Sequence, residues 1–428
     1  MQSYFRGVRG YGRDIKLFLL YNLLSNVGIG VFQLLFNLYL IQLGYDEAFI
    51  GQFQSISTLS MAGVALSIGV LVNRFGVWRT VMAGLVFFLV TSVLASIITN
   101  QFALLVMAGL SGAGTAFLFV PTMPFIVELT GRHERHGVAA LAFSLNSLSM
   151  TVGSLIGGFG ARGIGGIFGL EVPSAEAYRY TLIAGLVLAG FAVLPLMAMS
   201  NERKRALPED EQASGLPATG AVAQAPRTIR RHMMVFIAIG GLMSLGAGAV
   251  FPFYNVFLES RGASAGQIGI IYAAAGLTAA FVGLFSPWVA HRLGSLKATA
   301  IVRLAPVPIY ILLMATPALP VAILAHIVRT TSINMAWPID STYISDVLPA
   351  RARASVFSFR SGAWNLGWSF SSLIAGYAIV RYGYNVSFAA YIIFMSLAMG
   401  LFYIYFSRSA SQEQLPAAQA GEPASATE

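Results

Sequence analysis

Four ionisable residues lie inside long apolar stretches of this chain, where burial of a charged side chain is energetically costly. They are Arg303, Arg329, Asp340 and Arg360. Asp340 and Arg360 lie at matching distances from the connection between two such stretches, so we expect them to lie at the same depth and to pair, which offsets the cost of burial. The pair is either a static structural ion pair or a switch that takes up and releases a proton at Asp340. The sequence leaves both interpretations open.

Amide side chains follow one face of the first apolar stretch. Asn22, Asn26, Gln33 and Asn37 follow one another at intervals of 4, 7 and 4 residues, which places them within one arc of an α-helix. Exposure of these amides to lipid would be unfavourable. We therefore expect the arc to face a water-filled cavity, with hydrogen bonding to a neighbouring helix as the alternative.

Twelve apolar stretches are available to position these residues, and each is long enough to cross the hydrocarbon core, which takes roughly 17–25 residues. They cover 16–43, 48–72, 78–99, 102–128, 137–161, 178–199, 232–259, 265–290, 297–316, 319–347, 353–380 and 384–407. The chain is 57% hydrophobic and only 10% charged, which excludes a water-soluble globular fold. It contains no cysteine, so a disulfide scaffold is excluded as well. The predicted fold class is an all-α polytopic membrane protein.

The stretches divide into two groups of six on either side of a segment rich in Ala, Pro, Gly and charge. The predicted organisation is a leader at 1–15, a first bundle at 16–199, a linker at 200–231, a second bundle at 232–407 and a disordered tail at 408–428.

The net charge of +9 is unevenly distributed between the two predicted sides of the membrane. Only Arg162, Arg179, Arg261 and Arg381 fall in connections on one side, whereas most of the 26 Lys and Arg residues fall on the other. The positive-inside rule then places both termini and the linker in the cytoplasm. Since the charge is accounted for by topology, the expected partner is a lipid bilayer, and no nucleic acid is expected.

The two halves align at one constant offset of 218 residues. Matching pairs include Asn37 with Asn255, Gly44 with Gly262, Arg74 with Arg292, Glu128 with Asp346, and Arg135 with Arg353. An ungapped repeat of this kind predicts two pseudo-symmetric six-helix bundles that face a shared central site.

The connection after the second stretch reads Gly69-Val-Leu71-Val-Asn73-Arg74-Phe-Gly76. It resembles the G-x-L-x-D-R-x-G motif of the major facilitator superfamily, with Asn73 where Asp is usual. A degraded copy that contains Arg292 and Gly294 follows the eighth stretch. The resemblance implies the fold of that superfamily and secondary transport of a small solute by alternating access. Gly153-Ser154-Leu-Ile-Gly157-Gly158 resembles the antiporter motif of its drug exporters, with Ser154 in place of proline. The resemblance suggests export, but close helix packing by small residues is the simpler explanation of this stretch.

The resemblance also implies that the first, fourth, seventh and tenth stretches line the substrate cavity. The candidate cavity residues are Asn22, Asn26, Gln33, Asn37, Ser111, Thr115, Thr122, Asn255, His326, Arg329, Trp337, Asp340, Arg360 and Trp364. The candidate cytoplasmic gate consists of Asn73, Arg74, Glu128, Arg135, Arg292, Asp346 and Arg353, with simple topology determinants as the alternative.

Arginines outnumber the one carboxylate inside the second half, which favours an amphiphilic and anionic or zwitterionic solute. The argument weakens if Arg303 extends to the cytoplasmic surface. No G-x-x-x-x-G-K sequence occurs, so we expect no nucleotide or other cofactor, and the energy source is a proton gradient through Asp340 or the solute gradient itself.

A facilitative or uptake transporter of a metabolite is the alternative function. A membrane-embedded enzyme or sensor is a remote one, since no catalytic arrangement and no metal-ligand spacing among the five histidines is found. The protein is expected to function as a monomer in the inner (plasma) membrane of a bacterium.

Overall fold

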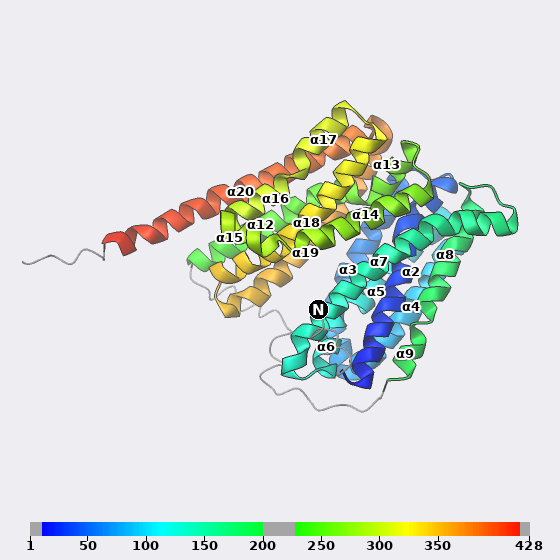
Figure 1. Cartoon of the computed structure of the whole chain (residues 1–428), viewed down its shortest axis with the longest axis horizontal. Coiled ribbons are helices and arrows are strands. Elements are labelled where there is room, and N and C mark those ends of the chain that lie inside the picture. Colours follow the sequence, from blue (N-terminus) through cyan, green and yellow to red (C-terminus); the bar gives the residue numbers. More distant parts are fainter. Residues whose placement is uncertain (1–10, 200–226, 420–428) are drawn as a thin grey trace, which may run out of the picture.

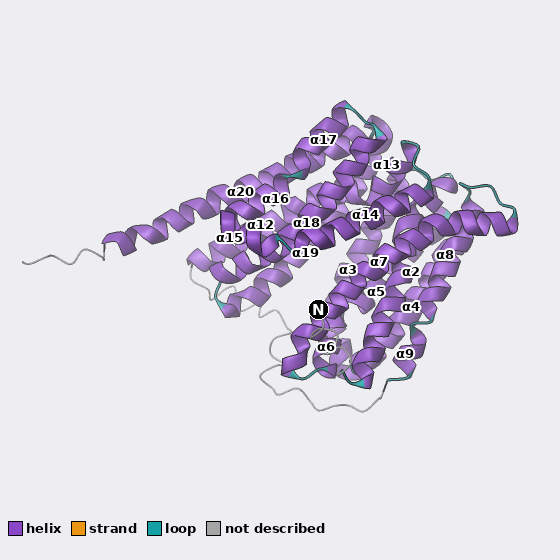
Figure 2. Ribbon diagram, in the orientation of Figure 1, coloured by secondary structure: helices purple, strands orange, loops and turns teal. Residues whose placement is uncertain are grey.

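The computed structural model describes residues 11–199 and 227–419, and these residues fold into helices without any strand (Figure 2). The first half contains α2 (Arg13–Gln42), α3 (Glu47–Phe75), α4 (Val77–Ile97), α5 (Gln101–Phe119), α6 (Thr122–Leu129), α7 (Arg132–Phe168), α8 (Ala175–Gly190) and α9 (Val193–Met197). The second half contains α12 (Arg227–Val250), the 3-10 turn η1 (Phe251–Phe253), α13 (Tyr254–Ser260), α14 (Ala265–Gly283), α15 (Ser286–Leu293), α16 (Ser295–Leu304), α17 (Pro306–Ala315), α18 (Leu319–Val347), α19 (Ala350–Tyr382) and α20 (Tyr384–Gln419).

Several crossings consist of two consecutive helical segments, because proline lacks the N–H group that a continuous helix needs. Pro121 separates α5 from α6, Pro252 lies in η1, and Pro306 begins α17. Within the described residues, eleven continuous or broken helices are long and apolar enough to cross a membrane. The long helix α19 is not among these eleven, because its 33 residues are rich in Ser, Trp and Arg. The predicted all-α polytopic membrane fold is therefore confirmed.

The boundaries differ from the prediction mainly at the C-terminal end. The prediction that the chain becomes disordered at 408 is wrong for the first part of the tail, because the backbone of α20 stays helical to Gln419. At the linker, α12 begins at Arg227, five residues before the predicted start at 232. The leader up to residue 10, the linker segment 200–226 and the end of the tail at 420–428 lie outside the described residues.

The two halves form two bundles, α2 to α9 and α12 to α20, as Figure 1 shows in blue to green and in green to red. Equivalent turns repeat at the predicted offset. Gly44 and Gly262 adopt φ angles of 88° and 87°, which favour glycine because it has no side chain. The repeat predicted from the sequence is thus present in the backbone.

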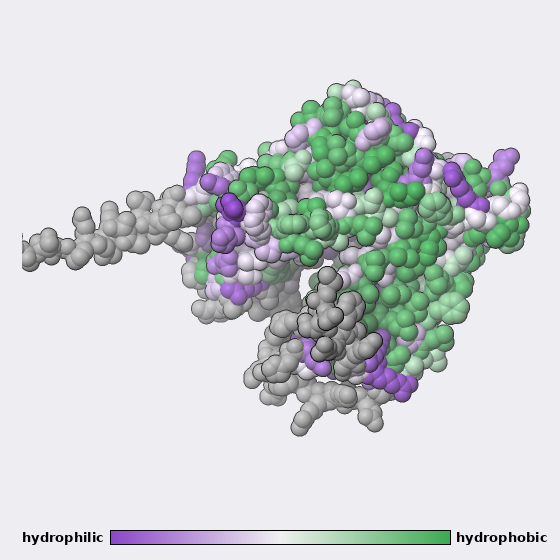
Figure 3. All heavy atoms as spheres, in the orientation of Figure 1, coloured by the Kyte–Doolittle hydropathy of each residue, from purple (hydrophilic) through white to green (hydrophobic). Residues whose placement is uncertain are grey.

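We call the end where α9 stops and α12 starts the base, and the opposite end, where α2 gives way to α3, the apex. The bundles pack together through α3 against α19 and through α7 against α14. They diverge toward the base, where α6 lies on one bundle and α15 on the other (Figure 1). Apolar side chains cover much of the outer faces between more polar ends (Figure 3), as expected of a surface in contact with lipid.

Candidate functional site

A cavity of about 720 Å³ lies between the two bundles. Residues of α2, α3, α5 and α7 form one wall, and residues of η1, α13, α14, α18 and α19 form the other. Figure 3 shows a hollow between the bundles on the side of the base. The cavity is therefore built from both sequence repeats.

Two reciprocal hydrogen bonds close the apex end of this cavity. Asn37 Nδ2 donates to the carbonyl of Pro252 at 2.6 Å, and Asn255 Nδ2 donates to the carbonyl of Leu34 at 2.7 Å. Donors and acceptors are both related by the offset of 218, so one contact is the symmetry equivalent of the other. These bonds fix the position of the pseudo-twofold axis between α2 and the η1–α13 segment.

Further polar contacts between the bundles lie near the apex. Tyr178 donates to Glu259 Oε1 at 3.0 Å, and Tyr384 donates to Glu47 Oε1 at 2.6 Å. The hydroxyls of Ser55 on α3 and Ser369 on α19 lie 2.7 Å apart. We call these three pairs the apex contacts, and together with the reciprocal asparagine bonds they hold this end of the molecule closed.

Arg329 is the charged residue in the cavity lining, and it is only 4% exposed. Its Nη1 donates to the Tyr310 hydroxyl at 3.0 Å, and its Nη2 lies 2.9 Å from His326 Nδ1. The guanidinium carbon lies 4.2 Å from the ring centre of Phe251 and 4.4 Å from that of Tyr254, within the range of cation–π contacts. Neutral groups and aromatic rings thus surround the cation.

Many of the sequence-predicted cavity residues line this cavity. They are Gln33, Asn37, Ser111, Thr115, Asn255, His326, Arg329 and Trp364. Asn22, Asn26, Thr122, Trp337, Asp340 and Arg360 do not line it, so their predicted location is corrected. The roles of all these residues stay predictions.

The polar arc of α2 changes its surroundings along the helix. Near the base, Asn26 donates to Asn22 Oδ1 at 2.9 Å and accepts from Asn146 Nδ2 of α7 at 2.7 Å. Both asparagines are buried, so they join α2 to α7, as the alternative interpretation of the arc proposed. Only the apex half of the arc, with Gln33 and Asn37, reaches the cavity.

Trp337 and Thr122 are not part of the cavity lining. Trp337 is 60% exposed, although it shares a face of α18 with the lining residues Thr330 and Asn334. Thr122 lies at the start of α6, after the break at Pro121, and donates to the carbonyl of Leu118 at 3.0 Å. The helix is interrupted at Pro121, so the residues after the break do not continue the face of α5. Helical spacing counted along the sequence did not include this interruption.

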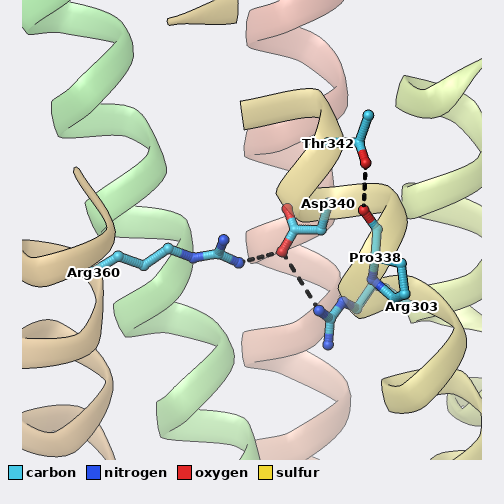
Figure 4. A network of polar contacts seen from close by, with 5 residues as sticks. All are labelled: Arg303, Pro338, Asp340, Thr342 and Arg360. Atoms are coloured by element: carbon cyan, nitrogen blue, oxygen red, sulfur yellow. Dashed lines mark hydrogen bonds and ion pairs between the residues drawn. The ribbon is translucent and has the colours of Figure 1, made fainter. Parts of the chain in front are cut away.

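Asp340 forms a buried cluster with two arginines (Figure 4), and none of the three residues belongs to the cavity lining. The Arg360 guanidinium pairs with Asp340 Oδ2, and Arg303 Nη2 lies 3.5 Å from the same oxygen. The predicted pairing of Asp340 with Arg360 is confirmed. Arg303 does not extend to the surface, because it is 4% exposed and points at the carboxylate.

The candidate gate residues lie at the base in two separate groups. Asn73, Arg74, Arg292 and Asp346 are exposed, and Arg353 Nε donates to the carbonyl of Leu348 at 2.9 Å. Arg74, Glu128 and Arg135 belong to the first bundle, and their repeat equivalents belong to the second. Because the bundles diverge here, this conformation leaves the predicted gate untested.

The aromatic residues around Arg329 were not identified from the sequence. Tyr254, Tyr272 and Tyr310 were not distinguished from the many aromatic residues of apolar helices. A signal was nevertheless available in the repeat, because Phe36 and Ser92 occupy the positions equivalent to Tyr254 and Tyr310. Among the described residues, no group of three or more His, Asp or Glu side chains could hold a metal ion.

Comparison with known proteins decides the family. The family model described as Major Facilitator Superfamily matches residues 18–356 and 331–428. This chain belongs to the major facilitator superfamily. It is an integral, multi-pass membrane protein of that family, as its helices indicate.

Two curated relatives match part of the chain. The enterobactin exporter EntS of Escherichia coli O127:H6 (strain E2348/69 / EPEC) is 28% identical over 281 residues, which cover 58% of this chain and 64% of the relative. The multidrug resistance protein MdtH of Yersinia pestis (strain Pestoides F) is 28% identical over 144 residues, which cover 33% of this chain and 36% of the relative. The matches thus span less than two thirds of each superfamily relative.

Solved structures share the fold over most of the chain. The nucleoside transporter NupG has a TM-score of 0.73 at 14% identity and covers 92% of this chain and 98% of its own. A bacterial homologue of the human lysosomal transporter Spinster, in an inward-facing and unoccupied conformation, has a TM-score of 0.72 at 15% identity and covers 91% and 96%. At such low identity the likeness shows the superfamily fold alone.

Proposed function

We propose that this protein is a secondary transporter that moves a small organic solute across a bacterial inner membrane by alternating access. The observation that carries the proposal is the cavity between two pseudo-symmetric bundles, which are joined at the apex and diverge toward the base. Such an arrangement exposes one site to each side of the membrane in turn when the two bundles rock against each other. A single chain contains the whole cavity, which supports a functional monomer.

The base faces the cytoplasm in this proposal. Arg74, Arg79, Arg292 and Lys297 are exposed at the base, in agreement with the positive-inside rule. Both termini and the linker then lie on the cytoplasmic side, and the described conformation opens inward. The candidate gate residues would meet when the base closes.

Export is the proposed direction of transport. The relatives EntS and MdtH bear the names of an exporter and of a multidrug resistance protein, and this supports export. The alternative is facilitated or inward transport of a metabolite, and the name of the nucleoside transporter NupG, which shares the fold, supports a metabolite as the solute. Coupling to a proton gradient is a further proposal, and Asp340 is its candidate carboxylate, with a structural role of its buried ion pairs as the alternative.

The test begins with a thermal-shift screen of the purified protein against metabolites and antibiotics at two pH values. Each stabilising compound is then assayed for flux in proteoliposomes, with and without a proton gradient, against protein-free liposomes. We expect at least one compound to cross in a protein-dependent manner. A gradient that accelerates flux indicates coupling, and equal flux without it indicates facilitation. Compounds that bind but never cross would contradict the proposal.

A further inference from the structure

Arg329 is a buried cation without a carboxylate partner in the part of the chain that the structure describes. No Asp or Glu of those residues lies within the 4.0 Å of an ion pair, in contrast to Arg303 and Arg360, which share Asp340. An unpaired buried charge is unfavourable unless a partner arrives. The cavity is the route by which such a partner can reach it.

The hydrogen bonds to Arg329 leave its charge uncompensated. A guanidinium only donates, so His326 Nδ1 must accept from Arg329 Nη2 and carries no proton. His326 is therefore neutral in this arrangement, and its ring stacks on Tyr254 with ring centres 5.3 Å apart. The Tyr310 hydroxyl is the second neutral acceptor. Arg329 Nε, in addition, has no hydrogen-bond partner.

The rings of Phe251 and Tyr254 lie against the guanidinium of Arg329. Only the edge of the planar group is then left for a ligand, and two oxygens of a carboxylate match that edge geometrically. A primary ammonium or other cation would be repelled at this position.

The charge is confined to one wall of the cavity. The repeat equivalent of Arg329 is Ser111, which lines the opposite wall. That wall offers neutral donors and acceptors, among them Gln33, Gln54 and Thr115. Both walls are also strongly aromatic, with Phe32, Phe36 and Phe53 in the first bundle and Phe251, Trp364 and Trp368 in the second.

We propose that Arg329 binds the carboxylate of an aromatic organic acid whose ring lies among the aromatic side chains of the cavity. This inference rests on the proposed function, since it names the substrate class of the same cavity. One cation in an apolar lining selects a ligand with one negative charge, because a second charge would remain unpaired when buried. Neutral polar groups of the ligand face the wall that contains Ser111.

The test is a binding experiment on the purified full chain in detergent, independent of transport. Equilibrium dialysis compares three probes of one shape: 1-naphthoate, the neutral 1-naphthamide and the cationic 1-naphthylmethylamine. Loss of a charged hydrogen-bonding partner costs about 1.5–3 kcal/mol, or roughly tenfold to more than a hundredfold in affinity. We expect naphthoate to bind at least about tenfold more tightly than naphthamide, and the amine to bind least.

Variants then assign the preference to one side chain. Arg329→Gln is expected to abolish the advantage of naphthoate over naphthamide, and Arg329→Lys to retain part of it, because lysine keeps the charge but loses the planar edge. Lys297→Gln is the matched control, since it removes an exposed positive charge at the base.

The comparison of the three probes on the unmodified protein tests the charge preference of the cavity even if Arg329→Gln fails to fold. Equal binding of the three probes, or no binding of naphthoate, would overturn the inference. A naphthoate preference that persists in a folded Arg329→Gln variant would also overturn it. Protein-dependent flux of a neutral compound in these cases would leave the proposed transport function standing.

Discussion

Asp340 is shared by Arg303 and Arg360 in a place where water has almost no access. The three side chains come from α16, α18 and α19, so one carboxylate joins three helices of the second bundle. A buried pair is favourable only while each charge keeps its partner. Loss of the carboxylate charge would leave two guanidinium groups facing each other, which favours the structural interpretation of this cluster over the proton switch.

Asp340→Asn is therefore expected to lower the free energy of unfolding by about 3–5 kcal/mol, the usual effect of removing one partner of a buried ion pair. The triple variant Arg303→Met, Asp340→Asn, Arg360→Met removes all three charges and should regain much of that loss. Thermal unfolding followed by intrinsic fluorescence measures both. If Asp340→Asn instead unfolds like the unmodified protein but loses the pH dependence of flux, the switch interpretation holds.

At the scale of residues, the sequence correctly predicted the contact for which depth in the membrane was sufficient information. Asp340 and Arg360 were paired correctly because their distances from one connection match. The cavity interpretation failed for Asn22 and Asn26. Helical spacing shows which residues share a face of the helix, but it does not show which element packs against that face.

At the scale of elements, close backbone contacts join the bundles. An added Cβ at Gly51 of α3 would lie 2.5 Å from the Ser372 carbonyl of α19, and one at Gly269 of α14 would lie 2.6 Å from the Ser154 carbonyl of α7. The two contacts are equivalent under the offset of 218. Ser154, at the position where exporters of this superfamily have proline, thus contributes its carbonyl to an interface between the bundles.

Gly51→Ala should weaken this interface, because overpacking typically costs about 1–3 kcal/mol and a backbone carbonyl cannot easily move aside. We expect the apex to open more often. A thiol introduced by Ser369→Cys, at a position only 2% exposed, reports this as faster reaction with a maleimide. Gly63→Ala on the same helix is the matched control, because nothing lies within 4 Å of the added group. Equal rates in the two variants would show that the glycine contact does not hold the apex.

The helices themselves were largely predictable, since the length of an apolar stretch indicates a crossing whatever its partners. The end of α20 was not predictable in this way. A segment rich in Ala, Gln, Glu and Pro was interpreted as disordered, although Ala, Gln and Glu also favour a helix once a preceding helix has nucleated it.

At the scale of the whole molecule, the apex contacts and the divergent base correspond to one of the two conformations that the proposed alternating-access transport requires. The repeat predicted both bundles and the shared site, but it contains no information about which end is closed. That choice depends on contacts such as Ser55 with Ser369, which join residues 314 positions apart.

A disulfide across the apex is expected to stop transport. The Ser55 and Ser369 hydroxyls lie 2.7 Å apart, so Ser55→Cys with Ser369→Cys places two thiols at a separation close to that of a disulfide. The chain has no cysteine of its own, so no other disulfide can form within it. Oxidation should abolish the flux of any transported compound, and reduction should restore it, whereas each single variant should be insensitive. Undiminished flux in the fully oxidised double variant would contradict alternating access through the apex.

The reciprocal bonds of Asn37 and Asn255 also bear on how well the membrane remains sealed. Each amide donates to a carbonyl of the other bundle beside the apex end of the cavity. A rocking motion that preserves the pseudo-twofold symmetry lengthens both bonds alike, so neither is retained when the other breaks. Partly open states, through which protons or other small ions would leak and dissipate the cell's gradients, are therefore disfavoured relative to the closed and fully open ones.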